Sequence, residues 1–123
     1  MTSKFLHLRL RVKDTERSVN FYKENFGCEV VNRKTSPRGN KLTFLSLPGD
    51  NAVLELCEFP KDINTDFKLE EDIFHLAFSV DSMKEAYEQM ISRGVKFTEG
   101  GPEDSMTFIE DPDGYEIELL ERS

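Results

Sequence analysis

Tryptophan is absent from this sequence of 123 residues, and cysteine is nearly absent, since Cys28 and Cys57 are its two cysteines. They do not have CxxC spacing, and a chain of this length buries enough surface to fold without disulfide staples. We therefore predict two free thiols and a reducing, cytoplasmic location. Without Trp, ten Phe and three Tyr supply most of the bulk of the predicted core.

Positive charge is scarce as well. The chain has 16 Lys and Arg against 24 Asp and Glu, which gives a formal net charge of -8. Nucleic acids and anionic lipid surfaces are held mainly by Lys and Arg, so this balance argues against a nucleic-acid partner and a membrane partner. No apolar run approaches membrane-spanning length, and the start, MTSKFLHLRL, is too short and too charged for a signal peptide.

What the sequence does contain is an internal repeat, which decides how the rest is interpreted. The segment FLHLRLRV at 5–12 returns as IFHLAFSV at 73–80, and this alignment places His7 over His75. The apolar residues around the two histidines repeat with them. The repeat therefore predicts two modules of one fold.

A helical pattern follows each copy of the opening segment. In DTERSVNFYKENFG at 14–27 and SMKEAYEQMISRG at 82–94, apolar residues recur at spacings of three and four, and both segments end in glycine. Asp14 or Thr15 can cap the first helix. Ser82, with a glutamate three residues later, has the form of a capping box for the second.

Three predicted strands follow each helix, so each half has the order β-α-β-β-β. They cover 28–34, 41–48 and 52–58 in the first half, and 95–99, 105–112 and 115–121 in the second. We divide the chain into a first module at 1–58, a polar linker at 59–72 and a second module at 73–123. The predicted fold class is α+β, with two paired βαβββ modules forming a curved mixed sheet.

One histidine and one glutamate of each module fall on the strand face that the helices do not cover. Side chains alternate along a strand, so Leu8 and Leu10 pack under the helix while His7 faces the other way. The same alternation and the match of LELCE to IELLE complete the set of candidate metal ligands: His7, Glu55, His75 and Glu118. If the halves pair about an approximate two-fold axis, four ligands surround one ion. Two imidazoles and two carboxylates suit Ni, Co, Mn, Fe or Zn, and leave two positions of an octahedral ion open for catalysis.

In these motifs the sequence resembles glyoxalase I, within the vicinal oxygen chelate superfamily. The resemblance runs from His7 to Glu121 and is carried by LHLRLRVKDTERSVNFY, VLELCE, HLAFSVD, RGV and EDPDGYEIELLE. It places the family's metal ligands on the same four residues, and implies a homodimer with shared sites and one divalent ion per site. Nickel or cobalt is favoured, with zinc, manganese or iron as alternatives. The implied reaction turns a thiol hemithioacetal of methylglyoxal into a 2-hydroxyacyl thioester, which detoxifies methylglyoxal.

The resemblance also implies roles for individual residues. Glu118 and Glu55 are the candidate catalytic glutamates for proton transfer, with Glu118 preferred. Arg11 stands where the family has a glutathione-binding arginine, and Arg9 on the same face is the second candidate for substrate binding. At Phe59 the family often has Asn, and the loop GGPEDSM that starts at Gly100 is short and acidic where the family's loop is longer and basic.

Other functions share this scaffold and remain alternatives. The superfamily includes epimerases, thiol transferases that act on an antibiotic, dioxygenases, and metal-free proteins that bind a drug or metabolite. Epimerases usually carry Gln at the second ligand position, and the transferases and dioxygenases use two His and one Glu. Glu55 therefore favours a glyoxalase, and the complete set of four ligands argues against a metal-free binding protein.

Overall fold

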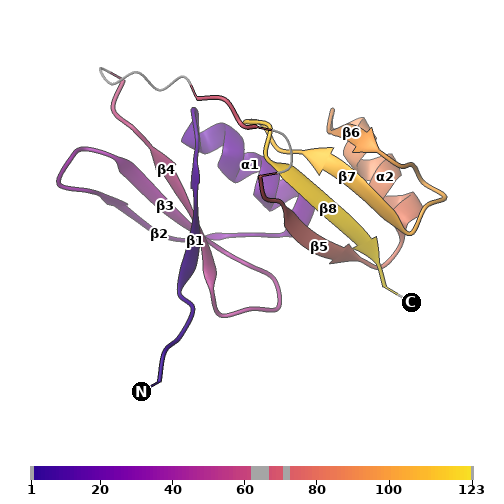
Figure 1. Ribbon diagram of the computed structural model, residues 1–123, viewed down its shortest axis with the longest axis horizontal. Helices are drawn as coiled ribbons and strands as arrows, with labels where there is room; N and C mark the ends of the chain where they lie inside the picture. The colour runs from indigo at the N-terminus through magenta and orange to yellow at the C-terminus, as the bar shows by residue number, and fades with distance from the viewer. Residues whose placement is uncertain (1, 62–66, 71–72, 123) are drawn as a thin grey trace. The chain divides into compact units, whose positions relative to one another are not determined.

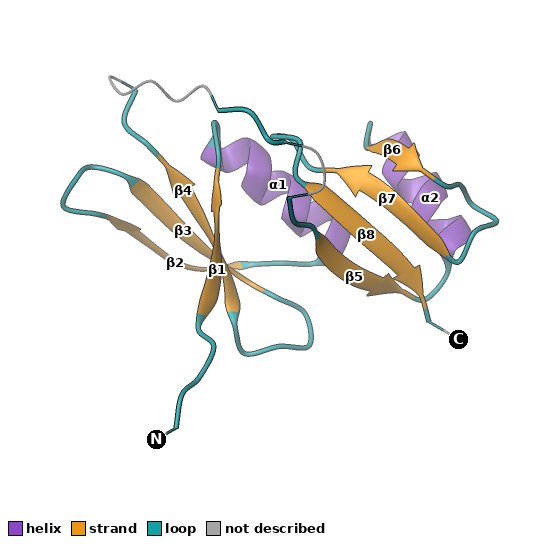
Figure 2. Cartoon of the chain, viewed as in Figure 1, coloured by secondary structure: helices purple, strands orange, loops and turns teal. Residues whose placement is uncertain are grey.

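The computed structural model describes residues 2–61, 67–70 and 73–122, and the chain divides into two units, Met1–Phe67 and Lys68–Ser123. The division falls inside the predicted linker at 59–72, part of which lies outside the described residues. Within the described residues, each unit holds one four-stranded sheet and one helix (Figures 1 and 2). Neither of the described helices is long and apolar enough to span a membrane.

The first unit has the predicted order β-α-β-β-β. Its elements are β1 (His7–Arg11), α1 (Thr15–Phe26), β2 (Val30–Thr35), β3 (Lys41–Ser46) and β4 (Val53–Glu58). In space the strands follow the order β1-β4-β3-β2. The pairing of β1 with β4 is parallel and the other two pairings are antiparallel, so this is a mixed sheet.

The second unit repeats this arrangement element by element. Its elements are β5 (Leu76–Val80), α2 (Met83–Ser92), β6 (Lys96–Glu99), β7 (Met106–Glu110) and β8 (Glu116–Glu121). The strand order is β5-β8-β7-β6, again with one parallel and two antiparallel pairings. The prediction of an α+β fold built from two βαβββ modules is confirmed.

Each sheet packs one face against its own helix, α1 against β3 and β4, and α2 against β8. Side chains alternate along β8, where Ile117 and Leu119 are fully buried and Leu120 is exposed. The central strand β4 departs from this alternation, because Glu55 and Cys57 are as well buried as their apolar neighbours. The candidate ligand Glu55 is therefore more buried than expected for a strand with one face exposed to solvent.

The N-termini of the helices carry the predicted caps. The side chain of Asp14 accepts a hydrogen bond from the backbone N–H of Arg17 at 3.1 Å, and Ser82 accepts one from Glu85 at 3.2 Å. Between the two candidates for the first cap, the structure selects Asp14. These caps satisfy N–H groups that the first turn of a helix leaves without a partner.

Besides its cap, each helix start binds a glutamate carboxylate that the sequence pattern did not predict. Glu58, at the end of β4, accepts hydrogen bonds from the backbone N–H of Thr15 at 2.8 Å and from its hydroxyl at 2.7 Å. Glu121, at the end of β8, accepts one from the backbone N–H of Met83 at 2.7 Å. Both glutamates occupy the same place in the repeat. Each one therefore ties the last strand of its module to the positive end of its helix.

Replacing Glu58 by Ala is expected to lower the free energy of unfolding by about 1.5–3 kcal/mol, the range for hydrogen bonds to a charged group. The carboxylate is largely buried and accepts two of them. Urea unfolding followed by circular dichroism measures the loss. Glu24→Ala, at an exposed position of α1, is the control and is expected to change stability by less than about 0.5 kcal/mol. Equal losses in the two variants would contradict a capping role for Glu58.

Candidate metal centre

In the first unit, the parallel pairing of β1 and β4 brings the predicted ligands His7 and Glu55 together. Atom Nε2 of His7 lies 3.5 Å from Oε1 of Glu55. The carboxylate is 3% exposed and the imidazole 43% exposed, so the pair has one buried and one accessible member. Phe44, the partner of Glu55 on β3, holds its ring edge-on to His7 with the ring centres 6.0 Å apart.

The second unit builds the same pair from equivalent residues. Atom Nε2 of His75 lies 3.3 Å from Oε1 of Glu118. Phe108, the partner of Glu118 on β7, stands edge-on to His75 with the ring centres 5.4 Å apart. The histidine, the glutamate and the aromatic ring thus recur together, which the sequence repeat predicted for the first two alone.

A tight turn between β7 and β8 sets the position of Glu118. The side chain of Asp111 accepts hydrogen bonds from the backbone N–H groups of Asp113 and Tyr115, each at 2.9 Å. Gly114 has a φ of 95°, a conformation that residues with a side chain rarely adopt. The sequence DPDG therefore starts β8 at a fixed register, which places Glu118 beside His75.

The geometry of both pairs fits a divalent ion. For an ion about 2.1 Å from each donor, two donors lie about 3.0 Å apart at a right angle and about 3.4 Å apart at the tetrahedral angle. The nitrogen–oxygen separation of 3.3 Å in the second pair lies within this range, and the 3.5 Å of the first pair lies just above it. Imidazole nitrogen with carboxylate oxygen is also a common ligand combination for such ions.

Each unit supplies two ligands of the proposed four. Among the residues that the structure describes, no group of three or more His, Cys, Asp or Glu side chains is placed to hold a metal ion. A catalytic centre with the predicted ligands thus needs one pair from each kind of unit. The convergence of all four on one ion stays a prediction.

The sequence profile of the Glyoxalase/Bleomycin resistance protein/Dioxygenase superfamily matches residues 4–119. The chain belongs to this superfamily. It is 35% identical to a lactoylglutathione lyase of Escherichia coli O157:H7, covering 96% of this chain and 92% of that protein. It is 34% identical to a glyoxalase I of Saccharomyces cerevisiae over 93% of this chain, although the chain spans 43% of the length of that relative.

A solved structure, the trypanothione-dependent glyoxalase I of Leishmania major, superposes with a TM-score of 0.85. It is 34% identical, and the match covers 98% of this chain and 87% of that one. The prediction of an enzyme similar to lactoylglutathione lyase is confirmed by these relatives. They support a glyoxalase-like function within the superfamily.

The two arginines predicted to bind substrate have partners on their own unit of this superfamily fold. The Nε of Arg9 donates a hydrogen bond of 2.5 Å to Oε1 of Glu55, and this bond raises the pKa of the Arg9 guanidinium. The guanidinium of Arg11 stacks over the ring of Phe59 at 4.1 Å, and the ring of Phe67 lies 5.3 Å away. Cation–π stacking of this kind orients an arginine without using its hydrogen-bond donors. Phe59, a departure from the family pattern, thus supports the Arg11 side chain.

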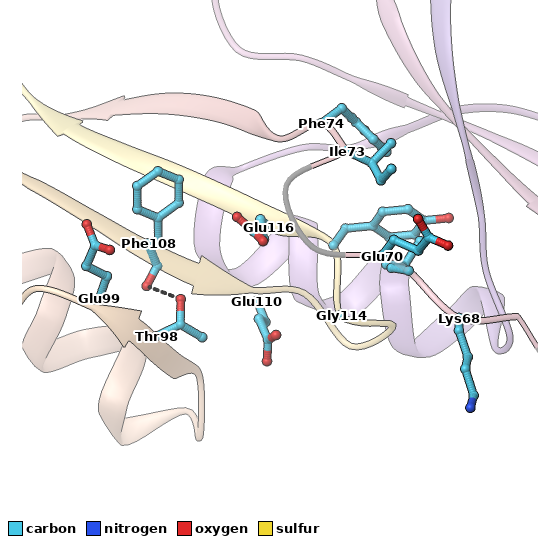
Figure 3. Close-up of a pocket in the computed structure, with 12 residues that line it drawn as sticks. Lys68, Glu70, Ile73, Phe74, Thr98, Glu99, Phe108, Glu110, Gly114 and Glu116 are labelled. Carbon is cyan, nitrogen blue, oxygen red and sulfur yellow. Dashed lines mark hydrogen bonds between the residues drawn. The ribbon is translucent and has the colours of Figure 1, made fainter.

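Residues of the second unit line a cavity of about 1030 Å³ (Figure 3). Phe108, which contacts His75, forms part of its wall, and the carbonyl oxygen of Phe108 accepts a hydrogen bond from Thr98 at 3.4 Å. The charged residues that line it are mostly acidic: Glu70, Glu99, Glu110, Glu116 and Lys68. Aromatic and acidic groups thus line this cavity, and Phe108 links its wall to His75, which is not itself a lining residue.

Cys28 and Cys57 are free thiols, as predicted, and both are fully buried. Burial raises the pKa of Cys28 to about 11 and also raises the pKa of Cys57. A thiol with a raised pKa stays protonated at neutral pH and is a poor nucleophile. Neither cysteine is therefore a candidate for covalent catalysis.

Proposed function

We propose that this chain is a divalent-metal-dependent glyoxalase I. It isomerises the hemithioacetal of methylglyoxal, or a similar 2-oxoaldehyde, with a glutathione-type thiol to a 2-hydroxyacyl thioester. The observation that carries the proposal is the duplicated His–Glu pair, with donor separations of 3.5 Å and 3.3 Å. Nickel or cobalt is the proposed ion and the cytoplasm the proposed location, the latter supported by the two free thiols.

The roles of the protein groups follow from their burial. A bound divalent ion supplies stabilisation of the negative charge that develops on the substrate oxygens. Glu118 takes the proton from the thiol-bearing carbon and returns it to the neighbouring carbon, so the step needs no external oxidant or reductant. Its side chain is 19% exposed against 3% for Glu55, and Glu55 is hydrogen-bonded to Arg9. Glu118 is thus the carboxylate with better access to substrate.

The decisive assay follows thioester formation by ultraviolet absorbance. Metal-free protein is reloaded with nickel, cobalt or zinc and mixed with methylglyoxal and a thiol. Activity that appears on addition of metal supports the proposal. Absence of thioester formation with every metal and thiol would contradict the proposal. Drug modification, substrate epimerisation and oxygen uptake would then be the activities to measure.

We further propose that the protein is a homodimer in which His7 and Glu55 of one chain face His75 and Glu118 of the other. Complementation between two inactive variants tests this arrangement. Random reassortment of His7→Ala and His75→Ala chains makes heterodimers in about half of the dimers, each with one intact site of two. The mixture is expected to recover about a quarter of the wild-type activity. If each site were built within one chain, the mixture would stay inactive.

The charge of the cavity predicts a preference among thiols. The Leishmania relative is described as trypanothione-dependent, so the thiol differs within the family. Glutamates around the cavity of the second unit repel a carboxylate of the thiol. We expect an adduct whose glycine carboxylate is converted to an amide with a terminal amine to react with a kcat/KM about tenfold higher than the free glutathione adduct.

Steady-state kinetics with the two adducts at low and high salt measures this preference. Because charge steering is screened by ions, the ratio is expected to fall as salt rises. A variant with Glu99→Gln and Glu116→Gln, both in the cavity wall, should bring the two adducts closer together. A preference for free glutathione that is independent of salt would contradict a role for the acidic wall.

A further inference from the structure

The two halves of the candidate centre differ at one position, and the difference is a positive charge. On the parallel strands β1 and β4, Arg9 lies directly opposite Glu55, and its Nε donates to Oε1 of that carboxylate at 2.5 Å. The same oxygen lies 3.5 Å from Nε2 of His7. Atom Oε1 of Glu55 therefore lies close to both Arg9 and His7, and His7 is a candidate metal ligand.

In the second unit the equivalent position holds a methyl group. Ala77 lies opposite Glu118 on the parallel strands β5 and β8, as Arg9 lies opposite Glu55. In the part of the chain that the structure describes, the ion pair seen for Glu118 is with His75. The two modules thus have equivalent candidate ligands, but different residues lie opposite the two glutamates: Arg9 opposite Glu55 and Ala77 opposite Glu118.

The arginine opposite Glu55 is important because the Glu55 carboxylate is buried. The Glu55 side chain is 3% exposed, so water does not satisfy its charge, and the guanidinium of Arg9 does so instead. A charge-assisted hydrogen bond of this kind is short and directional, so it restricts rotation of the carboxylate. Outer partners that orient a metal ligand are a large part of what makes a site bind its ion.

We propose that Arg9 is a positioning residue of the metal centre: it holds the Glu55 carboxylate in the orientation in which that carboxylate ligates the ion. The inference rests on the proposed function, since it assigns Glu55 to a metal centre. Glu118, with no arginine opposite, is the carboxylate that can move towards substrate. The side chain of Arg9 thereby acts through Glu55 and not on the substrate.

The test is the affinity of the metal-free protein for cobalt, measured by titration calorimetry together with the visible spectrum of the bound ion. Arg9→Met removes the donor and keeps the length of the side chain, and is expected to weaken binding about 10–100-fold, the usual effect of losing an outer partner. The cobalt absorption bands are expected to shift, because the coordinating oxygen changes orientation. A role in folding alone would leave the spectrum of the folded, loaded variant unchanged.

Two further variants keep the test sharp. Arg9→Lys retains the positive charge beside buried Glu55, so this variant is expected to fold even if Arg9→Met does not. It is expected to weaken cobalt binding by less than Arg9→Met. Arg33→Met is the matched control, because Arg33 also forms an ion pair with a glutamate of the first unit, Glu16, at 2.9 Å. Its cobalt affinity is expected to equal that of the unmodified protein.

The outcomes separate this inference from the proposed function. If the unmodified protein binds no metal, the proposed function fails. If it binds metal and Arg9→Met binds cobalt equally well or more tightly, with an unchanged spectrum, the positioning role is overturned and the proposed function stands. Weaker binding in Arg9→Met, with part of the affinity restored in Arg9→Lys and none lost in Arg33→Met, supports the role.

Discussion

Replacing His75 by Ala is expected to lower kcat/KM about a thousandfold or more, because loss of the ion removes several kcal/mol of transition-state stabilisation. The expectation rests on the 3.3 Å separation between Nε2 of His75 and Oε1 of Glu118, because removing the imidazole leaves Glu118 as the one proposed ligand from its unit. Loss of a direct ligand should also weaken metal binding more than the about 10–100-fold typical of an outer partner. Activity of nickel-loaded protein and its metal content by elemental analysis are the two measurements.

Ser79→Ala is the matched control for this variant. Ser79 lies on β5 on the same face as His75 and is exposed, so its hydroxyl can be removed without disturbing the core. It is expected to keep both metal and activity. A His75→Ala protein that retains one ion per chain and near-normal turnover would refute the assignment of His75 as a ligand, whatever the activity of Ser79→Ala.

The parts of this protein that could be predicted from its sequence are those with a local period. Alternation along a strand and a spacing of three and four along a helix need no knowledge of distant residues. The repeat also predicted which distant residues belong together, because equivalent positions lie at equivalent places in two copies of a fold. His7 with Glu55, and His75 with Glu118, were paired on that basis, and the structure brings each pair together.

The contacts that were missed join residues far apart in the chain. Arg9 and Glu55 are 46 positions apart, and Thr15 and Glu58 are 43 positions apart. Such contacts depend on the register between β1 and β4, which alternation does not specify, since a shift by two residues preserves every face. The structure shows Arg9 bound to Glu55, and its predicted role in substrate binding stays a prediction. Glu58 and Glu121 carried a usable signal, because they recur at equivalent positions of the repeat.

The second large effect is expected in the core that supports Glu118. Leu119, its neighbour on β8, is fully buried on the opposite face, so Leu119→Ala leaves a cavity beneath the strand. Substitutions of this kind typically cost about 3–5 kcal/mol in the free energy of unfolding. That is a large share of the roughly 5–15 kcal/mol that stabilises a domain, so the urea midpoint of the metal-free protein should fall sharply.

Ile91→Ala is the control for the Leu119 variant, since it removes a similar aliphatic side chain from the same unit at a position 46% exposed on α2. It is expected to change stability by less than about 0.5 kcal/mol, because little surface is returned to water and Ala favours helix. Hydrogen exchange should report faster opening of β7 and β8 in Leu119→Ala, since these strands share the disturbed face. Because Glu118 is carried by β8, cobalt affinity should weaken together with this protection. Leu119→Ala that matched Ile91→Ala in both stability and exchange would show that the buried face of β8 does not hold the ligand strand in place.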